Sequence, residues 1–239
     1  MYNAVRTRQR MLAVALPLTA ALYIGAEGLD PKGTDQLVTT TATAFKVLPI
    51  AASHSTQLYG SGSLSELALG AVAVSYAAIA MLVRERGSMA ATIAAVLGGT
   101  GAFCGAIVNV FVGISLAAAA TAHVTREAAA RFLIANFNSG PGQTFTDVYA
   151  FSEYFAPVIM GVALWRSRRV PRWLAVLFSV GFELAEDTTS VGPVKVVLQM
   201  ALFALAMVLL AVRIWRAAAP AAAAQYPPRP GAKCGLTRL

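Results

Sequence analysis

The chain has 239 residues, of which 57% are hydrophobic and 13% are charged, with a mean hydropathy of +0.64. This composition excludes an ordinary soluble domain and indicates an integral membrane protein. The formal net charge of +8 is also typical of nucleic-acid binding, but the arginines lie beside apolar runs and no nucleic-acid motif accompanies them. We therefore expect an all-α membrane protein with the lipid bilayer, and not nucleic acid, as its partner. The predicted architecture is a six-transmembrane-helix bundle with short amphipathic helices on its outer face.

The first predicted span runs from Met11 to about Ala26, after a basic lead. A cleaved signal peptide is the alternative, but five later apolar runs favour a retained span. Residues 27–43 are polar and contain Gly and Pro, so they predict an outer loop. Residues 45–63 are interrupted by Pro49 and by glycines, and we expect a short helix on the outer surface instead of a span.

The second and third spans are predicted from Leu64 to Val83 and from Met89 to about Ala118. Along the third, small residues recur every four positions and predict close packing against another helix. This stripe comprises Gly101, Gly105, Asn109 and Gly113. Asn109 is either an interhelical hydrogen-bond donor or the polar wall of a pocket.

Residues 121–142 predict an amphipathic helix on the outer surface, because apolar residues recur in it at helical spacing. These are Val124, Ala128, Phe132 and Ala135, and the helix should end at the run Asn138-Ser139-Gly140-Pro141.

Residues 144–190 predict a hairpin of the fourth and fifth spans around a basic hinge. Tryptophans flank the hinge, Pro171 stops either helix from continuing through it, and four arginines lie in it, namely Arg166, Arg168, Arg169 and Arg172. The sixth span begins at Lys195 and ends near Ile214. Residues 1–216 thus form one membrane domain, and residues 217–239 have the composition of a disordered cytoplasmic tail.

Lysine and arginine are retained on the cytoplasmic side of membranes. In this arrangement most of the 19 basic residues fall at one face, and only Lys32, Lys46, Arg126, Arg131 and Lys195 fall at the other. We therefore expect a multi-pass protein of the cell membrane with both termini in the cytoplasm.

Acidic and phenolic groups gather in the outer half of the predicted bundle. Glu153 lies well inside the fourth span, with Tyr149 one turn before it and Tyr154 beside it. On the fifth span Glu183 can share a helix face with Glu186 and Asp187. Because carboxylates so close together do not all ionise in a dry site, we expect one to keep a proton and to serve as a general acid. The alternative for Glu186 and Asp187 is that they lie beyond the membrane in water.

Several signatures are absent. The sequence contains no Walker loop, HExxH, nucleophile elbow or CxxC, and its two cysteines, Cys104 and Cys234, form neither a disulfide framework nor a metal site. No cofactor and no metal is expected.

Two stretches carry a resemblance to known proteins. The hinge run ALWRSRRVPRWLAVL and the motif EGLDPKG after the first span resemble a family of actinobacterial six-helix integral membrane proteins, a domain of unknown function. That resemblance implies the fold and no activity. In size, helix count and acidic, aromatic-rich helix ends, the chain is more remotely similar to small membrane-bound terpene cyclases. That resemblance implies protonation of a prenyl chain by a carboxylic acid.

The first functional hypothesis is therefore a membrane terpene cyclase, an isomerase or lyase of natural-product biosynthesis, whose substrate is a hydrophobic prenylated small molecule. Its candidate acids are Glu153, Glu183 and Glu186. The candidate substrate-binding residues are Tyr23, Glu27, Asn109, Tyr149, Tyr154 and Phe182. The alternative is a proton- or cation-coupled transporter or an accessory membrane protein, although the inner half lacks the acidic path that transport predicts. A third is a structural subunit, which the lack of a cavity beneath Glu153 would favour.

Overall fold

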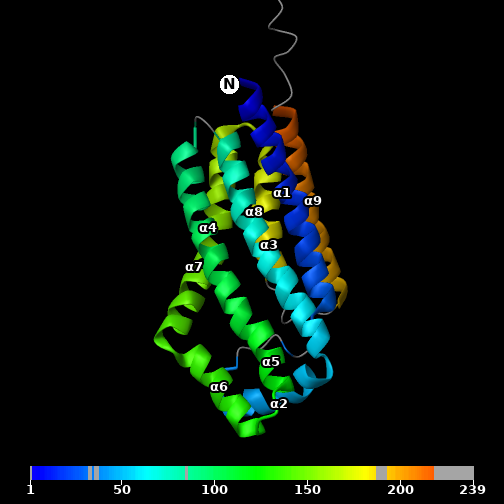
Figure 1. Cartoon of the computed structure of the whole chain (residues 1–239). Coiled ribbons are helices and arrows are strands. Elements are labelled where there is room, and N and C mark those ends of the chain that lie inside the picture. The colour runs from blue at the N-terminus through cyan, green and yellow to red at the C-terminus, as the bar shows by residue number, and fades with distance from the viewer. Residues whose placement is uncertain (1, 32–33, 35–37, 84–85, 187–192, 218–239) are drawn as a thin grey trace, which may run out of the picture.

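The computed structural model describes residues 2–31, 34, 38–83, 86–186 and 193–217, and every element in these ranges is helical (Figure 1). The helices are α1 Tyr2–Leu29, α2 Thr41–Ser53, α3 Ser55–Leu82, α4 Ser88–Asn109, a π-helical segment Val110–Ile114, α5 Ser115–Thr121, α6 Arg126–Asn138, α7 Gly140–Ser167, α8 Arg172–Glu186 and α9 Pro193–Ala217. Of the predicted tail, all but the first residue lies outside the described residues.

Six of these helices form a closed bundle. Neighbours contact each other in the order α1, α3, α4, α7, α8, α9, and α9 returns to α1. Inside the ring, side chains such as Leu16, Met160, Phe178 and Met207 are fully buried. Among the described residues, five helices are long and apolar enough to cross a membrane, and α8 adds a helix of 15 residues. The length and composition of these helices support the prediction of an all-helical multi-pass membrane protein.

A smaller group of helices extends the bundle at one end (Figure 1). We call α2, α5 and α6 the cap. They share a second apolar core that includes Val47, Leu48, Leu116, Leu133 and Phe137. This core is separate from that of the bundle, so the cap is a distinct packing unit carried on the ends of α3 and α4.

Hydrogen bonds fix the helices of the cap. The side chains of Thr40 and Thr125 each accept a backbone N–H three residues on, as N-caps do. Arg126 of α6 donates from Nη2 to the carbonyl of Phe45 in α2, and its guanidinium carbon lies 5.0 Å from the centre of the Phe45 ring. One arginine thus joins the two longer cap helices.

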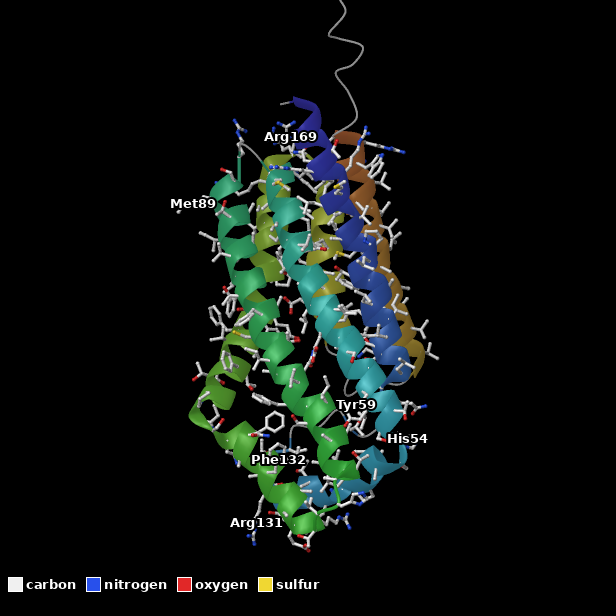
Figure 2. All side chains as sticks on the ribbon, in the orientation of Figure 1. His54, Tyr59, Met89, Arg131, Phe132 and Arg169 are labelled. Atoms are coloured by element: carbon white, nitrogen blue, oxygen red, sulfur yellow. The ribbon has the colours of Figure 1, made fainter. Side chains whose placement is uncertain are left out.

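The two ends of the molecule differ in their side chains. Figure 2 shows Arg169 and Met89 at the end opposite to Arg131 and His54. The predicted hinge is confirmed: α7 ends at Ser167 and α8 begins at Arg172, with Arg168 between them in a left-handed conformation at φ 55°.

The prediction that residues 45–63 form only a surface helix is wrong in its second half. Residues from Ser55 onward belong to α3, which therefore begins nine residues before the predicted Leu64. Its glycines do not break the helix, because they permit close contact: a Cβ on Gly62 would lie 3.3 Å from Cγ1 of Ile114. His54 is exposed at the junction of α2 and α3, where its Nδ1 lies 2.9 Å from the Ser53 hydroxyl.

The helix α6 ends at Asn138, as predicted, but it buries a different face. The predicted apolar residues are exposed, Phe132 to 53%, whereas Ala129, Ala130, Leu133 and Phe137 are buried. Both sets recur at helical spacing, and contact with α2 and α5 decides between them.

Candidate functional site

A cavity of about 320 Å³ lies within the bundle toward the cap. Helices α1, α3, α7, α8 and α9 and the junction of α4 with the π-helical segment all contribute to its wall. The polar residues of this wall are Tyr23, Glu27, Asp30, Thr34, Ser61, Ser65, Asn109, Tyr149 and Glu153. Small-molecule sites are usually clefts of about 300–1,000 Å³, so the cavity is large enough for a small ligand.

Three carboxylates lie in this wall. Glu27 and Asp30 come from the end of α1 and the residue after it, and Glu153 comes from the middle of α7. The Ser61 hydroxyl donates to Oδ1 of Asp30 over 3.4 Å, which links α1 to α3. Among the residues that line the cavity, none is Lys, Arg or His. The site is therefore acidic, and it favours cations or hydrogen-bond donors over anions.

A second, smaller hollow of about 20 Å³ adjoins the cavity. Tyr23, Leu69, Tyr149 and Glu153 line both spaces, so these four residues form the boundary between them. The hollow adds Val72, Tyr76, Gly98, Gly101, Ala102, Ser152 and Phe182. Glu153 thus lies where a wide polar space narrows to a largely apolar and aromatic one.

Aromatic rings pack below this boundary. The Phe182 ring lies 5.8 Å from that of Tyr76 and 5.4 Å from that of Phe203, both edge to face. The Phe203 ring is in turn 5.7 Å from that of Tyr23. Such edge-to-face pairs stabilise the fold beyond the effect of burial alone, so the positions of these four rings are well fixed. We call Tyr23, Tyr76, Phe182 and Phe203 the aromatic floor of the site.

The glycine stripe brings α4 against its neighbours, as predicted. A Cβ on Gly105 would lie 2.7 Å from the ring of Tyr149. Gly98, which the predicted stripe did not include, makes a similar contact, since a Cβ there would lie 2.7 Å from the ring of Tyr76. Gly101 faces Ser152 even more closely. Small residues let helices approach in this way, and here they also set the positions of side chains that line the site.

The π-helical segment begins directly after Asn109. Asn109 is half-buried, and it lines the cavity together with Val112 and Gly113 of the segment. Asn109 therefore takes the second of the two roles left open above, the polar wall of a pocket. π-Helical turns are rare in proteins, and those that do occur are often found at functional sites.

The structure gathers many of the predicted site residues. Tyr23, Glu27, Asn109, Tyr149 and Glu153 surround the cavity, and Phe182 lines the hollow.

Other predicted site residues lie elsewhere. Tyr154 is 59% exposed on the outside of the bundle, next to exposed Phe151 and Phe155. Glu183 is half-buried on α8 but does not line the cavity or the hollow, whereas Phe182 and Ala185 on either side of it do. The side chain of Glu186, and Asp187 entirely, fall outside the described residues. Of the four carboxylates named for the predicted hairpin, namely Glu153, Glu183, Glu186 and Asp187, only Glu153 lies in the cavity wall among the described residues.

Sequence reasoning missed Asp30, Ser61, Ser65 and Ser152. Asp30 was assigned to a loop, and both Ser61 and Ser65 lie near or within the stretch that was expected to be a surface helix. A signal existed for Ser152, since it lies three residues after Tyr149 and so shares its helix face. Among the described residues no group of three or more His, Cys, Asp or Glu could hold a metal ion.

Comparison with protein-family models, with curated proteins and with solved structures finds no match to this chain.

Proposed function

We propose that this is a six-span protein of the cell membrane with its arginine-rich end in the cytoplasm and its cap outside. The continuous helix Ser88–Thr121 has 34 residues, or about 51 Å at 1.5 Å per residue, against a hydrocarbon core of about 30 Å. Its excess length fits a cap that stands beyond the bilayer. The helix α8 packs between α7 and α9 and serves as the sixth span.

We further propose that the protein is a membrane terpene cyclase, which starts the cyclisation of a prenyl chain by protonating it. The observation that carries this proposal is the position of Glu153, a carboxyl group at the boundary between a ligand-sized cavity and an aromatic floor. A carboxylic acid in such a partly dry place can keep its proton and donate it to a weakly basic alkene.

The chemistry balances at this site. The Glu153 proton forms a new C–H bond at one carbon of a terminal alkene, and the cation develops at its more substituted neighbour. A second double bond attacks that carbon, which closes the ring and moves the positive charge to another carbon. Loss of a proton to the Glu153 carboxylate, or addition of a nucleophile, then gives the neutral product. Tyr23, Tyr149 and Phe182 surround the place where positive charge would develop, and aromatic rings stabilise cations. The Glu153 carboxylate left behind is also close enough to stabilise the cation.

The same geometry suggests how the substrate is oriented. Its reactive end lies beside Glu153, and its polar end lies toward Glu27, Asp30 and Ser61, which line the cavity but not the hollow. Because those groups include two carboxylates and no positively charged side chain, a head group with an N–H or a positive charge fits better than an acid. A prenylated indole or amine meets this description.

The test is conversion of a farnesylated indole by membranes that contain the wild-type protein or one of three variants. Glu153→Gln keeps the size of the side chain and removes the acid, so it should abolish the cyclised product. Glu183→Gln should retain activity because Glu183 does not line the site, and Glu127→Gln, exposed on α6, is the matched surface control. If folded protein converts none of a panel of prenylated substrates, the cyclase proposal is wrong.

The three cavity carboxylates favour one alternative, a cation-coupled transporter. Transport needs a path to the other side of the membrane. On the arginine-rich side of the site, however, the bundle is filled by fully buried side chains such as Met160, Phe178, Met207 and Leu210. Reconstituted protein should therefore show no uptake of organic cations into liposomes. Uptake that Glu153→Gln abolishes would favour the transporter.

A further inference from the structure

Ser152 is a deeply buried residue beside the proposed acid. It is 2% exposed, it lines the hollow, and its Oγ has no hydrogen-bond partner among the described residues. Buried polar groups are normally hydrogen-bonded, and each exception needs an explanation.

Other hydroxyls on the same helix behave differently. Thr144 and Thr146 of α7 each donate to the carbonyl four residues earlier, over 2.9 Å in both cases. This is the usual solution for Ser and Thr inside a helix. Ser152 does not adopt it, and the residue lines the hollow.

The size of the hollow identifies what it can hold. To hold one water molecule, a cavity needs about 10–15 Å³ of room for the centre of that molecule, and two to four polar partners. The hollow measures about 20 Å³. It is therefore large enough for one water and too small for a further isoprene unit. Besides Ser152, its lining includes Glu153 and the tyrosines Tyr23, Tyr76 and Tyr149.

We propose that the hollow is a binding site for one water molecule, held by Ser152, and that this water ends the cyclisation. This inference rests on the proposed cyclase function. The carbocation and the water form a C–O bond, and the resulting oxonium loses its proton to the Glu153 carboxylate. Glu153 thereby regains the proton that it gave at the start. The net reaction adds one water to the substrate, and the product is a cyclic alcohol instead of an alkene.

The position of the hollow supports this order of events. Glu153 lines both spaces, so a cation formed in the cavity and a water in the hollow meet at the same carboxyl group. The wider, polar cavity supplies the next water after product leaves.

The experiment is conversion of the farnesylated indole in ¹⁸O-labelled water, followed by mass spectrometry of the product. Wild-type protein should give an alcohol that carries the label. Ser152→Ala should lower the fraction of alcohol in the product by about fivefold or more, as expected for loss of one hydrogen bond, and should release alkene instead. Ser75→Ala is the matched control, because Ser75 is equally buried on α3 but its Oγ lies 3.0 Å from that of Thr19, within hydrogen-bonding distance.

The outcomes separate the two proposals. Cyclised product without ¹⁸O in the wild type would overturn the water site and leave the cyclase intact. No product from any of a panel of prenylated substrates would overturn both. Ser152→Cys keeps the shape of the side chain with a somewhat larger atom and weakens its hydrogen bond, so it should give the same shift toward alkene if the alanine variant does not fold. An unchanged product ratio in both variants would also overturn the role of Ser152.

Discussion

Gly105 of α4 and the ring of Tyr149 on α7 are in direct contact, so that a Cβ at position 105 would lie 2.7 Å from two ring carbons. Tyr149 has no free space on this side, and its ring also borders both the cavity and the hollow. The absence of a side chain at Gly105 is therefore a condition for the shape of the site.

This contact predicts the effect of Gly105→Ala. The added methyl should push Tyr149 out of place and lower the free energy of unfolding by about 1–3 kcal/mol, as overpacking usually does. Thermal unfolding of the detergent-solubilised protein measures the change. Gly99→Ala is the control, because no atom lies within 4 Å of a Cβ built there, and it should be neutral or slightly stabilising. Equal effects of the two substitutions would contradict this account of the packing.

Arg126 joins α6 to α2 through the carbonyl and the ring of Phe45. Arg126→Ala should weaken the cap by about 1 kcal/mol, the usual size of one exposed cation–π contact or net hydrogen bond. Hydrogen exchange should consequently quicken in α2 while it stays unchanged in α9. Arg131→Ala removes another exposed arginine of the same helix and serves as the comparison. Faster exchange in that variant alone would be inconsistent with the role of Arg126.

The proposed orientation can be tested with single cysteines. Cys104 and Cys234 are first replaced by alanine, and Arg131→Cys or Arg169→Cys is then introduced at opposite ends of the molecule (Figure 2). A membrane-impermeant maleimide should label position 131 in intact cells, because the proposed orientation places the cap outside. It should label position 169 only after the membrane is made permeable. The reverse pattern would mean that the protein is inserted the other way round.

Phe182 is 4% exposed, and its ring contacts those of Tyr76, Phe178 and Phe203. Phe182→Ala should lower the free energy of unfolding by about 3–5 kcal/mol because it leaves a hole in a packed floor. Denaturant titration in detergent measures this. Phe151→Ala is the control, since Phe151 is 55% exposed on the outside of α7, and it should cost less than about 1 kcal/mol. A loss as large as that of Phe182→Ala would contradict the larger contribution assigned here to the buried ring of Phe182.

Much of the fold could be predicted because its signals are local. The arginines around Pro171 mark the hinge, long apolar runs mark the spans, and the four-residue repeat from Gly101 to Gly113 marks a packing face. The start of α3 was missed because Gly62 signals a break by itself, and only contact with Ile114 of another helix makes it suitable for a helix interior. The buried face of α6 was missed for the same kind of reason, since two apolar faces compete and only α2 and α5 decide between them.

The residues of the site also fall into those that local sequence signals predict and those that depend on contacts between helices. Glu153 was identified because a carboxylate within an apolar run is unusual on its own, and Tyr149 follows from helical spacing. Asp30 and Ser61 are 31 residues apart, and their hydrogen bond depends on how α1 packs against α3. No local sequence pattern predicts that hydrogen bond. Glu183 shows the converse, because its sequence surroundings resemble those of Glu153 while its side chain does not line the cavity or the hollow.

The π-helical segment Val110–Ile114 has a consequence for how such a site can arise. A π-helical turn holds about one residue more than an α-helical turn, and the helices on both sides continue along the same axis. Deleting one residue within the segment would convert it to ordinary α-helix and leave both α4 and α5 intact. Because the wider turn itself accommodates the extra residue, the two flanks would keep nearly the same orientation about the axis, and the residues of the segment that line the cavity, Val112 and Gly113, would shift relative to Asn109. In evolutionary terms, a single codon inserted into a long plain helix is enough to produce this part of the cavity wall, and a single codon lost is enough to remove it.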